Sequence, residues 1–103
     1  MQRIKLMPDY ECFALWDENA VANLDADALP ISAQLKARIH RWEDAYDATL
    51  DRDDPARSGF ASERDLHAFD EEGRALWRCL RQELGDAYAV RYFSPISATV
   101  IDP

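Results

Sequence analysis

No stretch of this sequence is long and apolar enough to cross a membrane. Its apolar runs fall well short of the ~20 residues that a transmembrane helix requires. The first ten residues, MQRIKLMPDY, also lack the apolar core of a signal peptide. We therefore expect a cytoplasmic protein with no membrane partner. Cys12 and Cys79 lie far apart and form no CxxC pair, so in a reducing cytosol we expect two free thiols.

The sequence also lacks the motifs of common catalytic and cofactor-binding sites. It contains no GxSxG, P-loop, GxGxxG or HExxH pattern. An EF-hand calcium loop beginning at Asp51 would need Gly and Glu where the chain has Ala56 and Ser62. The side chains that could bind a transition metal show no ligand spacing: Cys12, His40, His67 and Cys79. We expect no cofactor, no metal and no catalytic residue.

Positive charge is in short supply. Twelve Lys and Arg face twenty Asp and Glu, which gives a formal net charge of −8. Nucleic-acid binding is disfavoured, because the phosphate backbone requires a basic protein face. Residues 43–72 contain eleven acids and three bases, and this segment accounts for the whole excess. The acidity is therefore a local feature of the chain.

The sequence contains enough apolar residues for one folded domain, residues 1–103. A domain of this length buries roughly 60–68% of the surface that its unfolded chain exposes. Two amphipathic helices are predicted. The first is capped by Ser32 and reaches about Leu50; the second is capped by Ser62 and ends at Gly85. Gly73 falls on the apolar side of the second helix, which indicates close contact with a neighbouring backbone.

Four segments have the alternation or the apolar content of strands. They are residues 2–7, 10–16, 87–93 and 96–101, and the last of them could lie at a sheet edge. Residues 17–30 show no period and are expected to form a loop. The resulting order, ββααββ, predicts an α+β fold in which a small antiparallel sheet packs against a two-helix hairpin.

The charges of the two helices differ in how they suit the helix dipole. The second helix opens with acids and ends with bases, as the dipole favours. The first helix does the reverse, with Glu43, Asp44 and Asp47 near its C-terminus, at a cost of a few tenths to about 1 kcal/mol each. In an antiparallel hairpin these acids would lie beside the acidic start of the second helix. The excess charge would then gather at one tip, either as plain solvated surface or as a binding site for a basic partner.

Three runs of the sequence carry a resemblance to known proteins. RIKLMPDYECFALW, DATLDRDDPARSGFAS and the EEGRALW…ELG ending resemble a family of small, acidic bacterial proteins of unassigned function. The resemblance spans most of the chain and implies no catalytic residues. Small acidic single domains of this kind also resemble, in general character, the immunity proteins that neutralise bacterial toxins.

We interpret the chain as a protein-binding module whose acidic tip docks onto a basic protein. The best-motivated case is an immunity- or antitoxin-like inhibitor of a bacterial toxin, because an acidic surface can cover the basic face that enzymes such as nucleases use to hold phosphates. Phe60 is the candidate apolar anchor. The predicted partner-binding residues are Asp44, Asp47, Asp51, Asp53, Asp54, Phe60, Glu63 and Asp65.

Two alternatives remain open from the sequence. One is a small enzyme or ligand-binding domain with a pocket between sheet and helices, lined by Tyr10, Cys12, Trp16 and Trp42. The other is a domain that forms oligomers through aromatic faces, with Tyr88, Tyr92 and Phe93 as the candidate contacts.

Overall fold

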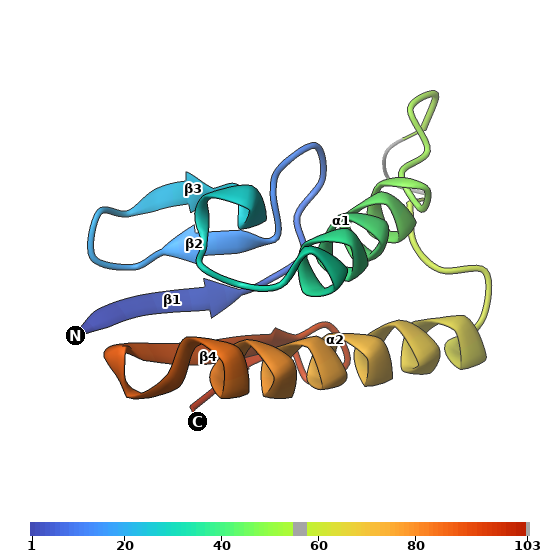
Figure 1. Ribbon diagram of the computed structural model, residues 1–103. Coiled ribbons are helices and arrows are strands. Elements are labelled where there is room, and N and C mark those ends of the chain that lie inside the picture. The colour runs from blue at the N-terminus through green and yellow to red at the C-terminus, as the bar shows by residue number, and fades with distance from the viewer. Residues whose placement is uncertain (55–57, 103) are drawn as a thin grey trace.

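The computed structural model describes residues 1–54 and 58–102 and confirms an α+β fold (Figure 1). Ala56, the sixth position of the calcium-loop comparison, lies outside the described residues. The elements in chain order are β1 Gln2–Leu6, β2 Leu15–Asp17, β3 Ala22–Leu24, the short 3₁₀ helix η1 Ala26–Ala28, α1 Ala33–Asp47, α2 Glu63–Leu84, the 3₁₀ turn η3 Gly85–Ala87, β4 Tyr88–Ser94 and β5 Thr99–Ile101.

The strands form one mixed sheet in the order β3-β2-β1-β4-β5. Most neighbours are antiparallel, but β1 and β4 are parallel, with Ile4 opposite Val90 and Leu6 opposite Tyr92. The prediction of an antiparallel sheet was therefore wrong at its centre. The chain passes out along α1 and back along α2, then reverses again at Gly85, so β4 enters the sheet in the same direction as β1 (Figure 1). A long helical crossover is what a parallel pair requires.

The segment between β1 and β3 differs most from its prediction. Only Leu15–Asp17 of the expected strand at residues 10–16 is a strand, and Glu11 has a positive φ of 59°. Residues 17–30, expected to be a loop, contribute the short strand β3 and η1. The missed turn is held by side chains of α1, which lie more than 25 residues away in the sequence.

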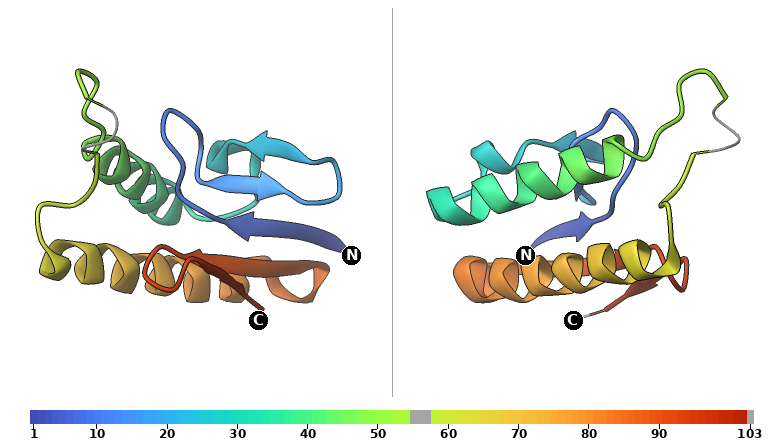
Figure 2. Two further views of the ribbon diagram at one scale, coloured as in Figure 1. Left: turned by 180° about the vertical axis from the view of Figure 1, so that it is seen from behind. Right: turned by 90° about the vertical axis from the view of Figure 1, so that its right-hand side faces the viewer.

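Both helices cover one face of the sheet, and the view from behind shows the strands in front of them (Figure 2). Ser32 and Ser62 cap the helices as predicted, by accepting hydrogen bonds from the N–H groups of Leu35 and Asp65. The first helix ends at Asp47, three residues earlier than expected. Sheet and helices enclose one core, whose larger members are Ile4, Leu6, Leu15, Leu29, Ile31, Leu35, Ile39, Trp42, Phe69, Leu76, Trp77, Leu80, Leu84, Val90 and Tyr92.

Gly73 is the point where both helices and the sheet meet. A Cβ atom built there would lie 2.6 Å from Cζ2 of Trp42 on α1 and 2.4 Å from the hydroxyl oxygen of Tyr92 on β4. The prediction of close contact at Gly73 is confirmed, although the neighbours are aromatic side chains and not backbone. Only glycine leaves room for both rings against α2.

Asp70 is a buried acid one helical turn before Gly73. Its Oδ1 accepts hydrogen bonds from the hydroxyls of Tyr92 at 2.8 Å and Ser94 at 3.0 Å, and its Oδ2 accepts from Nε of Arg74 at 2.9 Å. Burial alone would raise the pKa of this carboxyl, but the three donors outweigh it and the pKa is lowered. Tyr92, completely buried, serves this network and the core, so it is not available as the oligomer contact that the sequence suggested.

Replacing Gly73 with Ala should destabilise the protein, although Ala favours helix by about 1 kcal/mol. Overpacking costs about 1–3 kcal/mol, and displacing Tyr92 from Asp70 leaves buried polar atoms unpaired at a similar cost. We expect the free energy of unfolding, measured by urea titration, to fall by about 2 kcal/mol for Gly73→Ala and by more for Gly73→Ser. A Gly73→Ala protein at least as stable as the parent would contradict this packing.

Candidate protein-binding surface

The second half of α1 and the β1–β2 loop form one surface. The ring of Tyr10 stacks on that of Tyr46 with centroids 4.5 Å apart, and its hydroxyl lies 2.8 Å from Oγ1 of Thr49. The backbone N–H of Glu11 donates to Oδ1 of Asp47 at 2.9 Å. These contacts hold the turn at residues 9–13 against the acidic end of α1.

Glu43 is buried where that loop meets α1. Only 8% of its surface is exposed, and its Oε2 accepts a hydrogen bond from the N–H of Ala14 at 2.7 Å. Its Oε1 lies 2.8 Å from Nδ1 of His40. Glu43 and Asp47, two of the acids that oppose the dipole of α1, therefore fasten the β1–β2 loop. Their position has a structural reason, and only Asp44 of the three is left to solvent.

His40 lies between carboxylates on both sides. Besides Glu43 on Nδ1, its Nε2 is 3.0 Å from Oδ1 of Asp27 and 3.7 Å from Oδ1 of Asp25. Hydrogen bonds to Asp27 and Glu43 raise its pKa above the usual value, against a smaller opposing effect of burial. Asp25, Asp27 and His40 have ligand atoms close enough to share a metal ion. Both ring nitrogens are already bonded to carboxylates, however, which is the arrangement of an imidazolium ion pair.

The loop after α1 carries the next group of predicted residues. Asp51 points back into this loop, where its Oδ1 accepts the N–H groups of Asp53 and Asp54, both at 3.0 Å. Its own N–H donates to Oγ of Ser58 at 2.8 Å. The loop projects away from α2 (Figures 1 and 2). Asp53 and Asp54 are exposed on it.

The remaining predicted residues belong to the α2 side. Glu63 and Asp65 are exposed in the first turn of α2. Phe60 is half-buried, and its ring packs on Phe69 with centroids 4.9 Å apart. Phe60 and Asp65 line a groove between the helices, whereas Asp44 and Asp47 line a depression beside the β1–β2 loop. The predicted tip is therefore an extended surface with two sides and a projecting loop.

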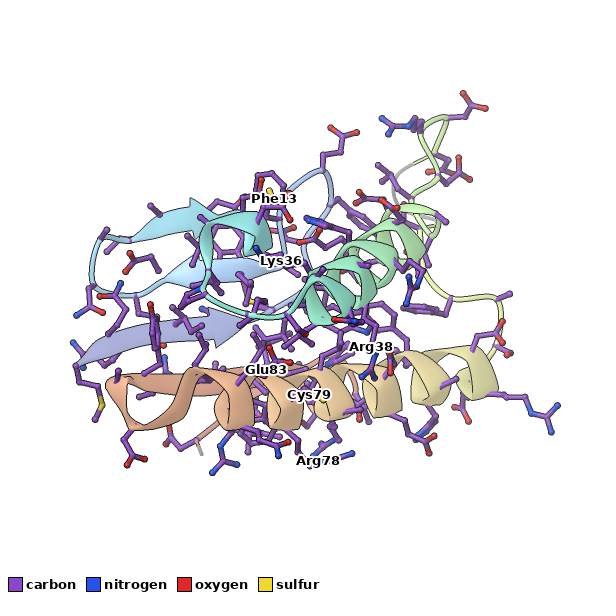
Figure 3. All side chains as sticks on the ribbon, viewed as in Figure 1. Phe13, Lys36, Arg38, Arg78, Cys79 and Glu83 are labelled. Atoms are coloured by element: carbon purple, nitrogen blue, oxygen red, sulfur yellow. The ribbon has the colours of Figure 1, made fainter. Side chains whose placement is uncertain are left out.

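The structure adds residues to this surface that the sequence analysis missed. Asp9 and Glu11 come from the β1–β2 loop, and Glu11 forms an ion pair with Arg52. Phe13, 40% exposed, lies near His40 with ring centroids 6.4 Å apart, and it lines the same depression as Asp44 (Figure 3). The acid-rich PDYE run was the available signal. The strand predicted over residues 10–16 began within this run, at Tyr10, and this concealed that the segment forms a loop facing α1.

The four residues of the alternative pocket are not brought together. Trp16 lines a depression with Lys5 on the sheet, Cys12 lies beside Phe13, and Trp42 is buried in the core. Tyr10 stacks on Tyr46, as described above. These four residues therefore do not line a common pocket among those that the described part of the chain forms.

Comparison with known proteins gives one family match. A sequence model described as Serratia CdiI immunity protein-like matches residues 2–95 of this chain. No curated protein matches it. Within residues 1–54 and 58–102, no helix is long and apolar enough to span a membrane.

The ion pairs of His40 predict a pH dependence of stability. Because the pKa of His40 is higher in the folded than in the unfolded protein, its stabilising effect is complete below the unfolded pKa of about 6.5 and is lost as pH rises through the folded pKa. Urea unfolding between pH 5.5 and 8.5 should show the parent losing stability relative to His40→Gln. The control is His67→Gln, at the exposed histidine of α2. Parallel pH profiles for parent and His40→Gln would refute the ion pairs.

Proposed function

The chain belongs to the family of Serratia CdiI immunity protein-like proteins, which have an inhibitory, protein-binding role against a bacterial toxin, and we propose that it binds its toxin through the acidic surface around the α1–α2 loop. The toxin would present a basic face to this surface. The inhibition would be steric and electrostatic, and would use no catalytic residue and no cofactor of this chain. Its location in the cytoplasm stays a prediction from the sequence.

The observation that carries the proposal is the accumulation of exposed acids on this surface. Of the eleven acids in residues 43–72, Glu43 and Asp70 are buried in hydrogen-bonded networks and Glu72 pairs with Arg38. The proposed toxin-binding acids are five exposed residues, Asp44, Asp53, Asp54, Glu63 and Asp65, together with the half-buried Asp47 and Asp51. Contacts within the fold therefore involve five of the eleven acids, namely Glu43, Asp47, Asp51, Asp70 and Glu72, and the other six are exposed.

An acidic surface of this kind suits an inhibitor for two reasons. It attracts a basic partner at long range and so raises the association rate, which competing salt then lowers. It also occupies the positive groups with which an enzyme acting on phosphates would hold its substrate. The exposed side chain of Asp9 extends the negative field onto the β1–β2 loop, where Glu11 is paired with Arg52.

The projecting loop gives the direct test. In the triple variant Asp51→Asn, Asp53→Asn and Asp54→Asn, the Asn side chain at 51 keeps an oxygen for the loop N–H groups while three charges are removed. We expect slower association with the toxin, by about tenfold at low salt, and a flatter dependence of the association rate on salt. Stopped-flow or surface plasmon resonance measures both.

The toxin is first identified by capture on the immobilised protein at low and high salt, followed by mass spectrometry and a growth-protection assay. A control triple variant, Glu71→Gln, Asp86→Asn and Asp102→Asn, changes the net charge equally at exposed positions elsewhere. If both triple variants associate alike, net charge alone matters and the proposed surface is wrong. If no toxin is inhibited, the proposed function itself is wrong.

A further inference from the structure

An open groove of about 580 Å³ runs between α1 and α2, within the range typical of ligand pockets. Its residues come from both helices and from the loop that joins them: Arg38, Arg41, Trp42, Ala45, Ala48, Thr49, Gly59, Phe60, Ala61, Asp65, Ala68, Phe69 and Glu72. The ion pair between Arg38 and Glu72, 2.8 Å from nitrogen to oxygen, links the helices across the groove (Arg38 is labelled in Figure 3).

Aromatic rings form the floor of the groove. Trp42 and Phe69 stack across the helix interface with centroids 4.4 Å apart and nearly parallel planes, at 7°. The indole N–H of Trp42 donates to the carbonyl oxygen of Phe69 at 2.9 Å, so this ring is held in place. Phe60 packs against Phe69 from the loop. A rigid apolar floor of this kind is the setting in which a partner's side chain gives the most binding energy.

Small side chains leave the floor open to a partner. Ala45 of α1, Ala61 of the loop and Ala68 of α2 are exposed and line the groove. Ala48 does the same at the C-terminal end of α1. Larger residues at these positions would fill the space above Trp42 and Phe69. The helices therefore approach closely at their buried side and leave a channel at their exposed side.

Two charges flank the channel. Arg41 on α1 and Asp65 on α2 form no ion pair with any residue of the described segments. Asp65 is continuous with Glu63 and the acidic surface, so a cation is the complementary group on that side. A second copy of this chain is a poor occupant, because it would bring two acidic surfaces together.

We propose that this groove receives a large apolar side chain of the toxin, aromatic or aliphatic, carried beside a Lys or Arg that pairs with Asp65. The inference rests on the proposed function and adds a short-range anchor to its long-range charges. The apolar side chain packs on the half-buried ring of Phe60 and on the exposed alanines above Trp42 and Phe69, and the surrounding charges exclude water from the contact. Arg41 is then available to an acidic group or a carbonyl oxygen of the same toxin segment.

Filling the groove from its exposed side tests the inference. Ala45→Trp and Ala68→Trp place a ring over the floor, whereas Ala37→Trp makes the same change at an exposed position of α1 outside the groove. With the toxin captured above as probe, we expect dissociation at least about tenfold faster for the two groove variants, with little change in association rate or salt dependence. The control should dissociate like the parent. Thermal unfolding is the check that all three variants are folded.

The outcomes separate the inference from the proposed function. If the charge-neutralised loop variant associates slowly but the groove variants dissociate like Ala37→Trp, the surface is right and the anchor is wrong. Equal effects of all three Trp substitutions would also overturn the anchor. If light scattering shows a dimer that only the groove variants dissociate, the occupant is a second copy and the inference is wrong. If neither the parent nor any variant binds a toxin, both the proposed function and the inference are wrong.

Discussion

The absence of a side chain at Gly73 is the constraint on which the rest of the structure depends. It allows Trp42 of α1 and Tyr92 of β4 to meet at the surface of α2. From there Tyr92 reaches Asp70, and Trp42 stacks on Phe69. Gly73 therefore determines how far apart the two helices lie and how they pack on the sheet. It also determines where the aromatic floor of the outer groove lies. A core arranged in this way tolerates few changes of side-chain volume, because close-packed interiors transmit strain to every neighbour.

The acids of the chain divide into two kinds that the sequence alone does not separate. Asp70 and Glu43 are buried and satisfied by several donors, so they contribute to the fold. Asp53 and Glu63 reach solvent and are available to a partner. The acids near the C-terminus of α1, which oppose the helix dipole, thus have two roles. Glu43 and Asp47 fasten the β1–β2 loop, and Asp44 contributes negative charge at the surface.

Sequence patterns predicted the helices, their serine caps, the terminator Gly85 and the strands at both ends of the chain, because each depends on neighbours a few residues apart. They failed for residues 10–14. That segment contains alternating apolar residues, but Ala14 and Glu11 donate to side chains of α1 and a turn forms instead. Parallel pairing of β1 with β4 was missed for a similar reason, since it depends on the direction of helices far along the chain. The candidate site was named largely by charge, so the sequence did not predict that its residues lie on two sides of the projecting loop.

The division between projecting loop and groove matches a division of physical roles in binding. Charges on an exposed loop act over the Debye length of ~8 Å and mainly affect how often partners meet. A dry aromatic floor acts only at contact and mainly affects how long they stay together. Asp65 and Phe60 belong to the predicted acidic surface and also line the groove, so a toxin attracted by these charges would arrive beside the floor. A protein that must neutralise a toxin before it acts benefits from both fast capture and slow release, and under our proposals the projecting loop would serve the first and the groove the second.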